Sequence, residues 1–207
     1  MPVHNQIDPR LSSTAGKIEI PEVLHRVNDF YDRAVKAMEQ QLWSKQQPDL
    51  KKLEDDLAAI RKAIARKADF LQSEDPAILT RQTGDFVLAD LTPTFTSVQA
   101  IANRTSTRKK LVTVALALAA YKSDKGKYPS SLTELTTEST VTTGKTTTKA
   151  PPYLKALPLD FFSEKGDKPF SYKVDGNGYV LYSVGENMKD DSGKDKDNGG
   201  DDIVIKK

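Results

Sequence analysis

The chain has 207 residues, enough for one sizeable domain or two small ones. Its 31 Lys and Arg residues nearly balance its 29 Asp and Glu residues, and this net charge of +2 excludes a strongly basic nucleic-acid binder. The lack of cysteine excludes disulfides, thiol catalysis and Cys-ligated zinc, and 2 histidines are too few for a histidine-rich metal site. No segment has the roughly 20 apolar residues that a membrane-spanning helix needs.

The first predicted element is an amphipathic helix over residues 20–46, which follows a polar leader at residues 1–18. Pro21 suits the first helical turn, where its missing N–H costs nothing. Apolar side chains recur at steps of three and four and form one stripe: Val23, Val27, Phe30, Ala34, Met38 and Leu42. We expect Phe30 and Trp43 to lie in the core that this helix forms with the next one.

A second helix is predicted over residues 50–71, after a break at Pro48 and Asp49. Its heptad-like seam consists of Leu50, Leu53, Leu57, Ile60, Ile64, Lys67 and Leu71. The seam either binds a partner chain as a coiled coil or packs inside a helical hairpin. The short connection favours the hairpin, because helices joined by short loops pack as neighbours.

Residues 73–92 are weakly patterned, with turn signals and a short apolar run that fits either a helical turn or a strand. A long helix is then predicted over residues 94–125. Thr92 is a plausible cap, Gly126 provides the stop signal at the other end, and Pro129 lies just beyond. At 1.5 Å per residue such a helix is about 45 Å long and serves as the spine of a domain.

The remaining chain changes to short strands and turns. Residues 130–135 predict a short helix with a capping box, in which Ser131 is followed by Glu134. The Thr-rich residues 136–149 predict an exposed insertion with a hairpin turning at Gly144 and Lys145. Two β-rich runs within 170–184 flank a turn, which is a strong hairpin signal, and residues 203–205 supply a last strand.

An acidic loop, residues 185–202, joins the last two predicted strands and holds many hard oxygen ligands. Calcium takes six to eight such oxygens from carboxylates, amides and backbone carbonyls. The EF-hand pattern fails, because Gly199 occupies its fifth position and no glutamate closes the loop. Spacing alone therefore leaves two interpretations, a calcium site or a solvated acidic loop.

Four ordered motifs in the C-terminal half resemble the major pseudopilin of type II secretion systems. They are LALAAYKSDKGKYP at 116–129, YLKALPLD at 153–160, YVLYSVG at 179–185 and DDI at 201–203. The resemblance implies a long spine helix on a small antiparallel sheet and a non-enzymatic role. It also implies a periplasmic or cell-envelope location and partners among other envelope or secretion-system proteins.

The same resemblance implies calcium as the bound ion of the acidic loop. Carried over residue by residue, its ligands are the Val184 carbonyl, Asn187, Asp201 and Asp202. Asn187 stands where the family has an aspartate, and the loop here is longer. The neighbouring carboxylates that could restore the lost charge are Asp190, Asp191 and Asp197.

The N-terminal half departs from the pseudopilin pattern, because a helical hairpin stands where the family has an apolar membrane helix. A membrane anchor, if the protein has one, is expected upstream of this segment. We expect an α+β fold with a flexible leader at 1–18, a helical hairpin region at 19–91 and a pseudopilin-like domain at 92–207, in which residues 136–149 are an insertion.

The predicted function is that of a non-enzymatic, pseudopilin-like protein of the envelope or secretion system, stabilised by calcium in its C-terminal half. The alternative is an interaction module whose helical hairpin binds a partner while the pilin-like half serves as scaffold. A hydrolase with an unrecognised site is a third interpretation, because fold alone does not fix function.

Overall fold

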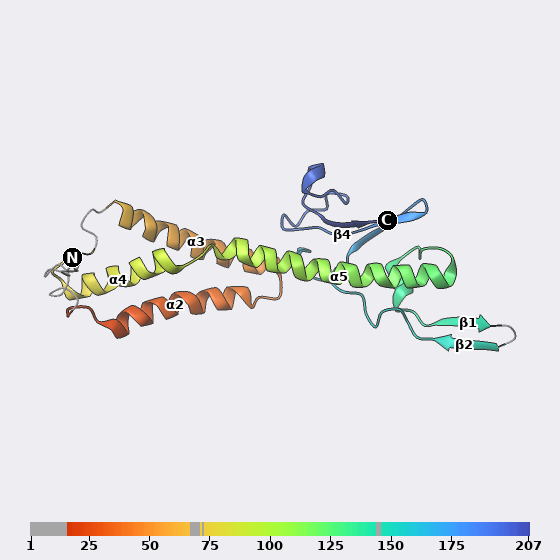
Figure 1. Cartoon of the computed structure of the whole chain (residues 1–207), viewed down its shortest axis with the longest axis horizontal. Helices are drawn as coiled ribbons and strands as arrows, with labels where there is room; N and C mark the ends of the chain where they lie inside the picture. Colours follow the sequence, from red (N-terminus) through yellow and green to blue (C-terminus); the bar gives the residue numbers. More distant parts are fainter. Residues whose placement is uncertain (1–15, 67–70, 72, 144–145) are drawn as a thin grey trace, which may run out of the picture. The chain divides into compact units, whose positions relative to one another are not determined.

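Helices occupy the first part of the chain and strands the last, which confirms the predicted α+β class (Figure 1). The computed structural model describes residues 16–207 except 67–70, 72 and 144–145, so most of the predicted leader lies outside the described residues. The chain forms two units, each made of two segments. The first unit comprises the described residues up to Glu39 together with Gln47–Thr96, and the second comprises Gln40–Gln46 and Ser97–Lys207. Among the described residues, no helix has the length and apolar character needed to cross a membrane.

The first unit contains α2 (Ile20–Met38), most of α3 (Trp43–Ala65) and α4 (Pro76–Leu91). The predicted break at Pro48 is wrong, because the helix break lies between Met38 and Trp43 and Pro48 sits inside α3. A proline near the start of a helix removes one backbone hydrogen bond without ending the helix. The actual break occurs where residues 40–46 join the other unit.

Residues 73–92, whose sequence pattern left a helical turn and a strand equally open, contain helix α4. Asp75 caps it by accepting hydrogen bonds from the amides of Ala77 and Ile78. Its buried positions include Thr80 and Gln82, so its inward face carries no clear apolar stripe. The helix packs against α2: Arg26 pairs with Asp85, and the Glu19 amide donates to Thr80 Oγ1 at 3.0 Å. The other buried positions of α4 are Leu79, Gly84 and Leu88.

The first half of the leucine seam of α3 is buried within the chain, whereas the extensive packing of α2 is with α4. Leu50, Leu53 and Leu57 are buried, and Ile60 and Ile64 are half-buried. Arg33 of α2 lies 2.5 Å from Asp56 of α3, which joins the two helices at their surface. The distal seam positions differ: Lys67 falls outside the described residues, and Leu71 is exposed.

Truncating this seam should destabilise the protein. Leu57→Ala removes a side chain that is only 2% exposed, so we expect a loss of about 2–5 kcal/mol from the lost burial and the cavity left behind. Leu24→Ala on α2 is the matched control, because Leu24 is exposed and its truncation should change stability by less than about 0.5 kcal/mol. Urea unfolding measures both, and equal losses would contradict an internally packed seam.

The second unit is built along α5 (Phe95–Lys125), whose bounds match the predicted spine helix closely. Gly126 ends the helix with φ +75°, and its amide donates to the Lys122 carbonyl at 2.8 Å. This left-handed stop costs a glycine little, because it has no Cβ to clash. The predicted capping box is also confirmed: Ser131 and Glu134 begin η1 (Leu132–Thr136), a short 3-10 helix.

Glu134 connects this corner of the unit to the spine helix. One carboxylate oxygen accepts from the Ser130 amide at 2.7 Å and from its hydroxyl at 2.6 Å, while the other accepts from Tyr121 at 2.5 Å. Hydrogen bonds from Ser130 and Tyr121 lower the pKa of Glu134 to about 2. The ionised carboxylate is therefore the form that the fold stabilises.

The lowered pKa of Glu134 predicts a specific acid sensitivity. Its contribution is fully present above its unfolded pKa of about 4.3 and is lost as the pH falls toward 2. Glu134→Gln should therefore lower the melting temperature at pH 7, and its difference from the wild type should shrink between about pH 5 and 2. Glu22→Gln, at an exposed position on α2, is the control and should show no such convergence.

A three-stranded antiparallel sheet completes the unit, with β3 (Ser171–Asp175), β4 (Gly178–Ser183) and β5 (Ile203–Lys206) in that order. The predicted hairpin and last strand are thus confirmed, and the register pairs Leu181 with Ile205. A separate two-stranded ribbon consists of β1 (Ser139–Thr143) and β2 (Thr146–Ala150), while the turn predicted at residues 144–145 lies outside the described residues.

Candidate functional site

The candidate site is the acidic loop 185–202 between β4 and β5, together with the residues that hold its two ends. Asp160, 2% exposed, holds the end of β4. Its carboxylate accepts from Ser183 Oγ at 2.6 Å and from the Val184 amide at 3.0 Å. The backbone of Val184, the first residue of the predicted ligand set, is therefore fixed. Sequence reasoning missed this role of Asp160, although the residue closes the LPLD motif.

Within the loop, Asn187, Asp191 and Asp201 form one hydrogen-bonded group. The Asn187 amide donates to Asp201 Oδ2 at 2.9 Å, and its side-chain nitrogen donates to Asp191 Oδ2 at 2.9 Å. The Asp201 amide donates to the same Asp191 oxygen at 2.8 Å. These hydrogen bonds, that from the Asn187 side chain first, lower the pKa of Asp191. Two of the predicted ligands, Asn187 and Asp201, thus contact each other and share the carboxylate of Asp191.

Asp202 follows Asp201 in the chain and is nearly inaccessible, with 1% exposure. It accepts hydrogen bonds from the amides of Gly193 at 2.7 Å and Asp191 at 3.4 Å. Burial raises the pKa of the Asp202 carboxyl above its usual range, and the nearby carboxylates of Asp191 and Asp190 act in the same direction. Backbone amides therefore hold the Asp202 carboxyl group close to the negatively charged carboxylates of Asp191 and Asp190.

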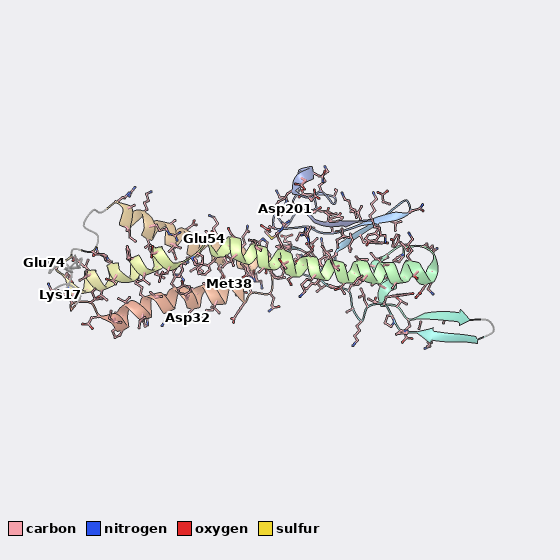
Figure 2. The ribbon with its side chains drawn as sticks, in the orientation of Figure 1. Lys17, Asp32, Met38, Glu54, Glu74 and Asp201 are labelled. Carbon is pink, nitrogen blue, oxygen red and sulfur yellow. The ribbon has the colours of Figure 1, made fainter. Side chains whose placement is uncertain are left out.

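Arg104 of α5 supplies the positive charge closest to this group. Its Nη1 lies 3.1 Å from Glu186 Oε1 and 3.3 Å from Asp201 Oδ1, and all three side chains are partly buried. Figure 2 shows Asp201 in this loop at the side of the sheet. The backbones at Gly185 and Asp201 also lie close together. A Cβ at position 185 would lie 2.2 Å from the Asp201 carbonyl oxygen, so only glycine fits there. The sequence offered no signal for Arg104, which is distant from the loop along the chain.

Trp43 supports the same loop from the segment 40–46. Its ring meets Phe162 edge to face at 5.8 Å, and its indole N–H donates to the Glu186 carbonyl at 2.9 Å. The expected place of Trp43 in the hairpin core is therefore wrong, whereas Phe30 does lie in a buried aromatic group with Tyr31 and Phe95. Trp43 thus combines a buried apolar ring with a hydrogen bond that holds the backbone of the loop at Glu186.

The candidate ligands of the loop are all oxygen atoms. Calcium binds such ligands, whereas transition metals favour nitrogen and sulfur. The backbone amide of Asn187 donates to Asp201, and the backbone amide of Asp191 donates to Asp202. As these side chains lie, they bond to backbone amides and to Arg104. Throughout the described part of the chain, no three acidic or histidine side chains converge closely enough to hold a metal ion. The donor chemistry fits calcium, although the side chains as they lie do not surround a common ion position.

A spine helix, a small antiparallel sheet and an acidic closing loop define a pilin-like architecture for the second unit. The model of the family Type II secretion system (T2SS), protein G, matches residues 95–203, more than half of the 207 residues. The chain belongs to this family, that of the major pseudopilin. Searches with this chain found no matching curated protein and no matching solved structure. Family membership indicates a secretion-associated, structural and non-catalytic protein of the envelope or periplasm.

Removing the cation of Arg104 should loosen the loop. Arg104→Gln leaves two carboxylates without their ion pair, so we expect a loss of about 1–2 kcal/mol and faster tryptic cleavage at Lys189, Lys194 and Lys196. Arg33→Gln is the control, because it breaks a more exposed ion pair in the other unit and should leave loop cleavage unchanged. Unchanged cleavage in Arg104→Gln would contradict the role assigned to this residue.

Proposed function

We propose that the chain is a structural, pseudopilin-like component of a secretion-associated envelope assembly and that calcium stabilises its acidic loop. Family membership supports the assembly role, because pseudopilins assemble with other secretion-system proteins. Two contacts join α5 to the region of the sheet: Arg104 pairs with the acidic loop, and Lys122 Nζ donates to the Asn177 carbonyl in the turn between β3 and β4 at 3.2 Å. Such a unit presents a rigid surface for assembly.

The observation that carries the calcium proposal is the buried, crowded carboxylate of Asp202. It is 1% exposed, and the residues between Met188 and Ile203 include no apolar side chain that could anchor the loop. Hydrogen bonds from backbone amides and Asn187, the ion pair with Arg104 and the charges of Lys189 and Lys194 must otherwise offset the mutual repulsion of several carboxylates. A buried charge without full compensation costs stability, and a divalent cation would remove that cost.

In the proposed site, calcium would be held by the Val184 carbonyl, Asn187, Asp201 and Asp202, with Asp191 as a further carboxylate. The ion would supply positive charge and bind the loop's oxygens together. The protein's own residues position the ends: Asp160 fixes the backbone at Val184, and Trp43 holds the carbonyl of Glu186. The function of the site is therefore structural, since it stabilises the connection between β4 and β5.

Thermal unfolding in millimolar calcium and in EGTA tests the proposal. An ion that binds only the folded state stabilises it by about 2.7 kcal/mol at a hundredfold excess over Kd. For a chain of this size that corresponds to a rise in melting temperature of roughly 5–10 °C. Magnesium should produce a smaller rise, because it requires a tighter octahedral cage. Isothermal calorimetry should show one bound calcium per chain.

Three isosteric variants sharpen this experiment. Asp201→Asn and Asp202→Asn should each abolish the calcium-dependent rise, because each removes a charged ligand while preserving shape and hydrogen-bond acceptance. Asp175→Asn, at the exposed end of β3, removes the same charge outside the loop and should retain the full rise. Identical melting curves in calcium and EGTA, with no heat of binding, would exclude the calcium site and leave the family assignment intact. Partner binding by the N-terminal helices stays a prediction.

A further inference from the structure

One face of α5 exposes a row of apolar side chains. Val98 is 56% exposed, Ile101 66%, Val112 45% and Leu116 67%. Their spacing places them on one side of the helix, opposite the buried positions Leu111, Val114 and Leu118. From Val98 to Leu116 this face is about 27 Å long, at 1.5 Å per residue. We call these four residues the α5 face.

Basic side chains lie beside the α5 face. Helix α5 has no acidic residue before Asp124, whereas Arg104, Arg108, Lys109 and Lys110 lie near its middle. Arg104 is paired with the acidic loop, but within the described part of the chain Arg108 and Lys109 form no ion pair. Both side chains are exposed. An occupant of this face would therefore meet apolar contacts flanked by free positive charge.

A hollow of about 650 Å³ lies along the same face. Ile101, Val112 and Ile203 provide its apolar lining, and Arg108 and Lys109 its charged rim; the other lining residues are Arg104, Thr105 and Thr113. Apolar anchors at three- and four-residue spacing beside a hollow match the way in which an amphipathic helix docks on a partner. Its charge complement is a helix with acidic flanks.

Two other occupants fit this face less well. A membrane surface is usually bound through aromatic and long apolar side chains, and α5 has no aromatic residue between Phe95 and Tyr121. A second copy docked through the same face would place Arg108 and Lys109 against their own counterparts. Like charges in an interface oppose association.

We propose that the α5 face is a docking site for an acidic amphipathic helix of a partner protein. Apolar side chains of that helix occupy the hollow between Ile101 and Val112, and its carboxylates pair with Arg108 and Lys109. The contacts proposed for the partner do not include the acidic loop, because Ile101, Val112, Arg108 and Lys109 all belong to α5.

The test uses the full chain and two designed, fluorescein-labelled peptide helices. Both carry leucine at the a and d heptad positions; one has glutamate and the other lysine at the flanking positions, which keeps each from pairing with itself. In fluorescence anisotropy the acidic peptide should bind at least about tenfold more tightly than the basic one, and salt should weaken its binding. Vesicles with anionic phospholipid should not co-sediment with the protein, and the protein alone should remain monomeric in sedimentation velocity.

Exposed-site variants localise the binding without threatening the fold. Ile101→Ser and Val112→Ser should each weaken the acidic peptide by roughly five- to tenfold. Arg108→Glu combined with Lys109→Glu should reverse the preference between the peptides. Controls of the same chemistry are Leu24→Ser on α2 and Lys51→Glu with Lys52→Glu on α3, which should leave binding unchanged.

Equal binding of the two peptides, or unchanged binding in the α5 variants, would overturn the proposal. Vesicle binding that these variants abolish would assign the face to a membrane instead. Self-association that Ile101→Ser abolishes would assign it to a second copy. Either result contradicts docking of an acidic helix.

Discussion

The structure depends on how the carboxylates between β4 and β5 are compensated. Residues 189–202 contribute no apolar side chain, so hydrophobic burial cannot fix this loop. Backbone amides, Arg104 and the docked ring of Trp43 hold it instead. Because β5 follows directly and forms one edge of the sheet, loss of this polar network would release the last strand as well. A cation is the simplest further source of compensation.

Helix α5 links the two functional aspects of the second unit. Its inward side buries Leu111, Val114 and Leu118, while its outward side exposes apolar and basic residues. Burial of the inward side fixes the helix on its own unit, whereas the apolar side chains of the outward side remain exposed. A pseudopilin-family unit needs both properties, a stable fold and an exposed surface for assembly. The separation of these two sides permits each to be altered independently.

Local patterns predicted most of the second unit, because its boundaries are set by residues close together in sequence. The glycine stop at Gly126 and the hairpin turn between β3 and β4 are of this kind. Helix α4 escaped prediction because its buried face includes the polar residues Thr80 and Gln82, which interrupt the apolar pattern; Thr80 accepts a hydrogen bond from the distant Glu19 amide. The roles of Trp43 and Arg104 also could not be predicted, since their partners lie far along the chain and depend on the completed fold.

Amide hydrogen exchange of the acidic loop most directly tests the central claim, that a bound cation completes the compensation of its carboxylates. The informative amides are those of Asp191, Gly193 and Asp201, which donate to the carboxylates of Asp202 and Asp191. The account predicts slower exchange of these three amides in calcium than in EGTA, while the Ser130 amide bonded to Glu134 exchanges equally in both. Equal exchange of the three loop amides in calcium and EGTA would contradict it.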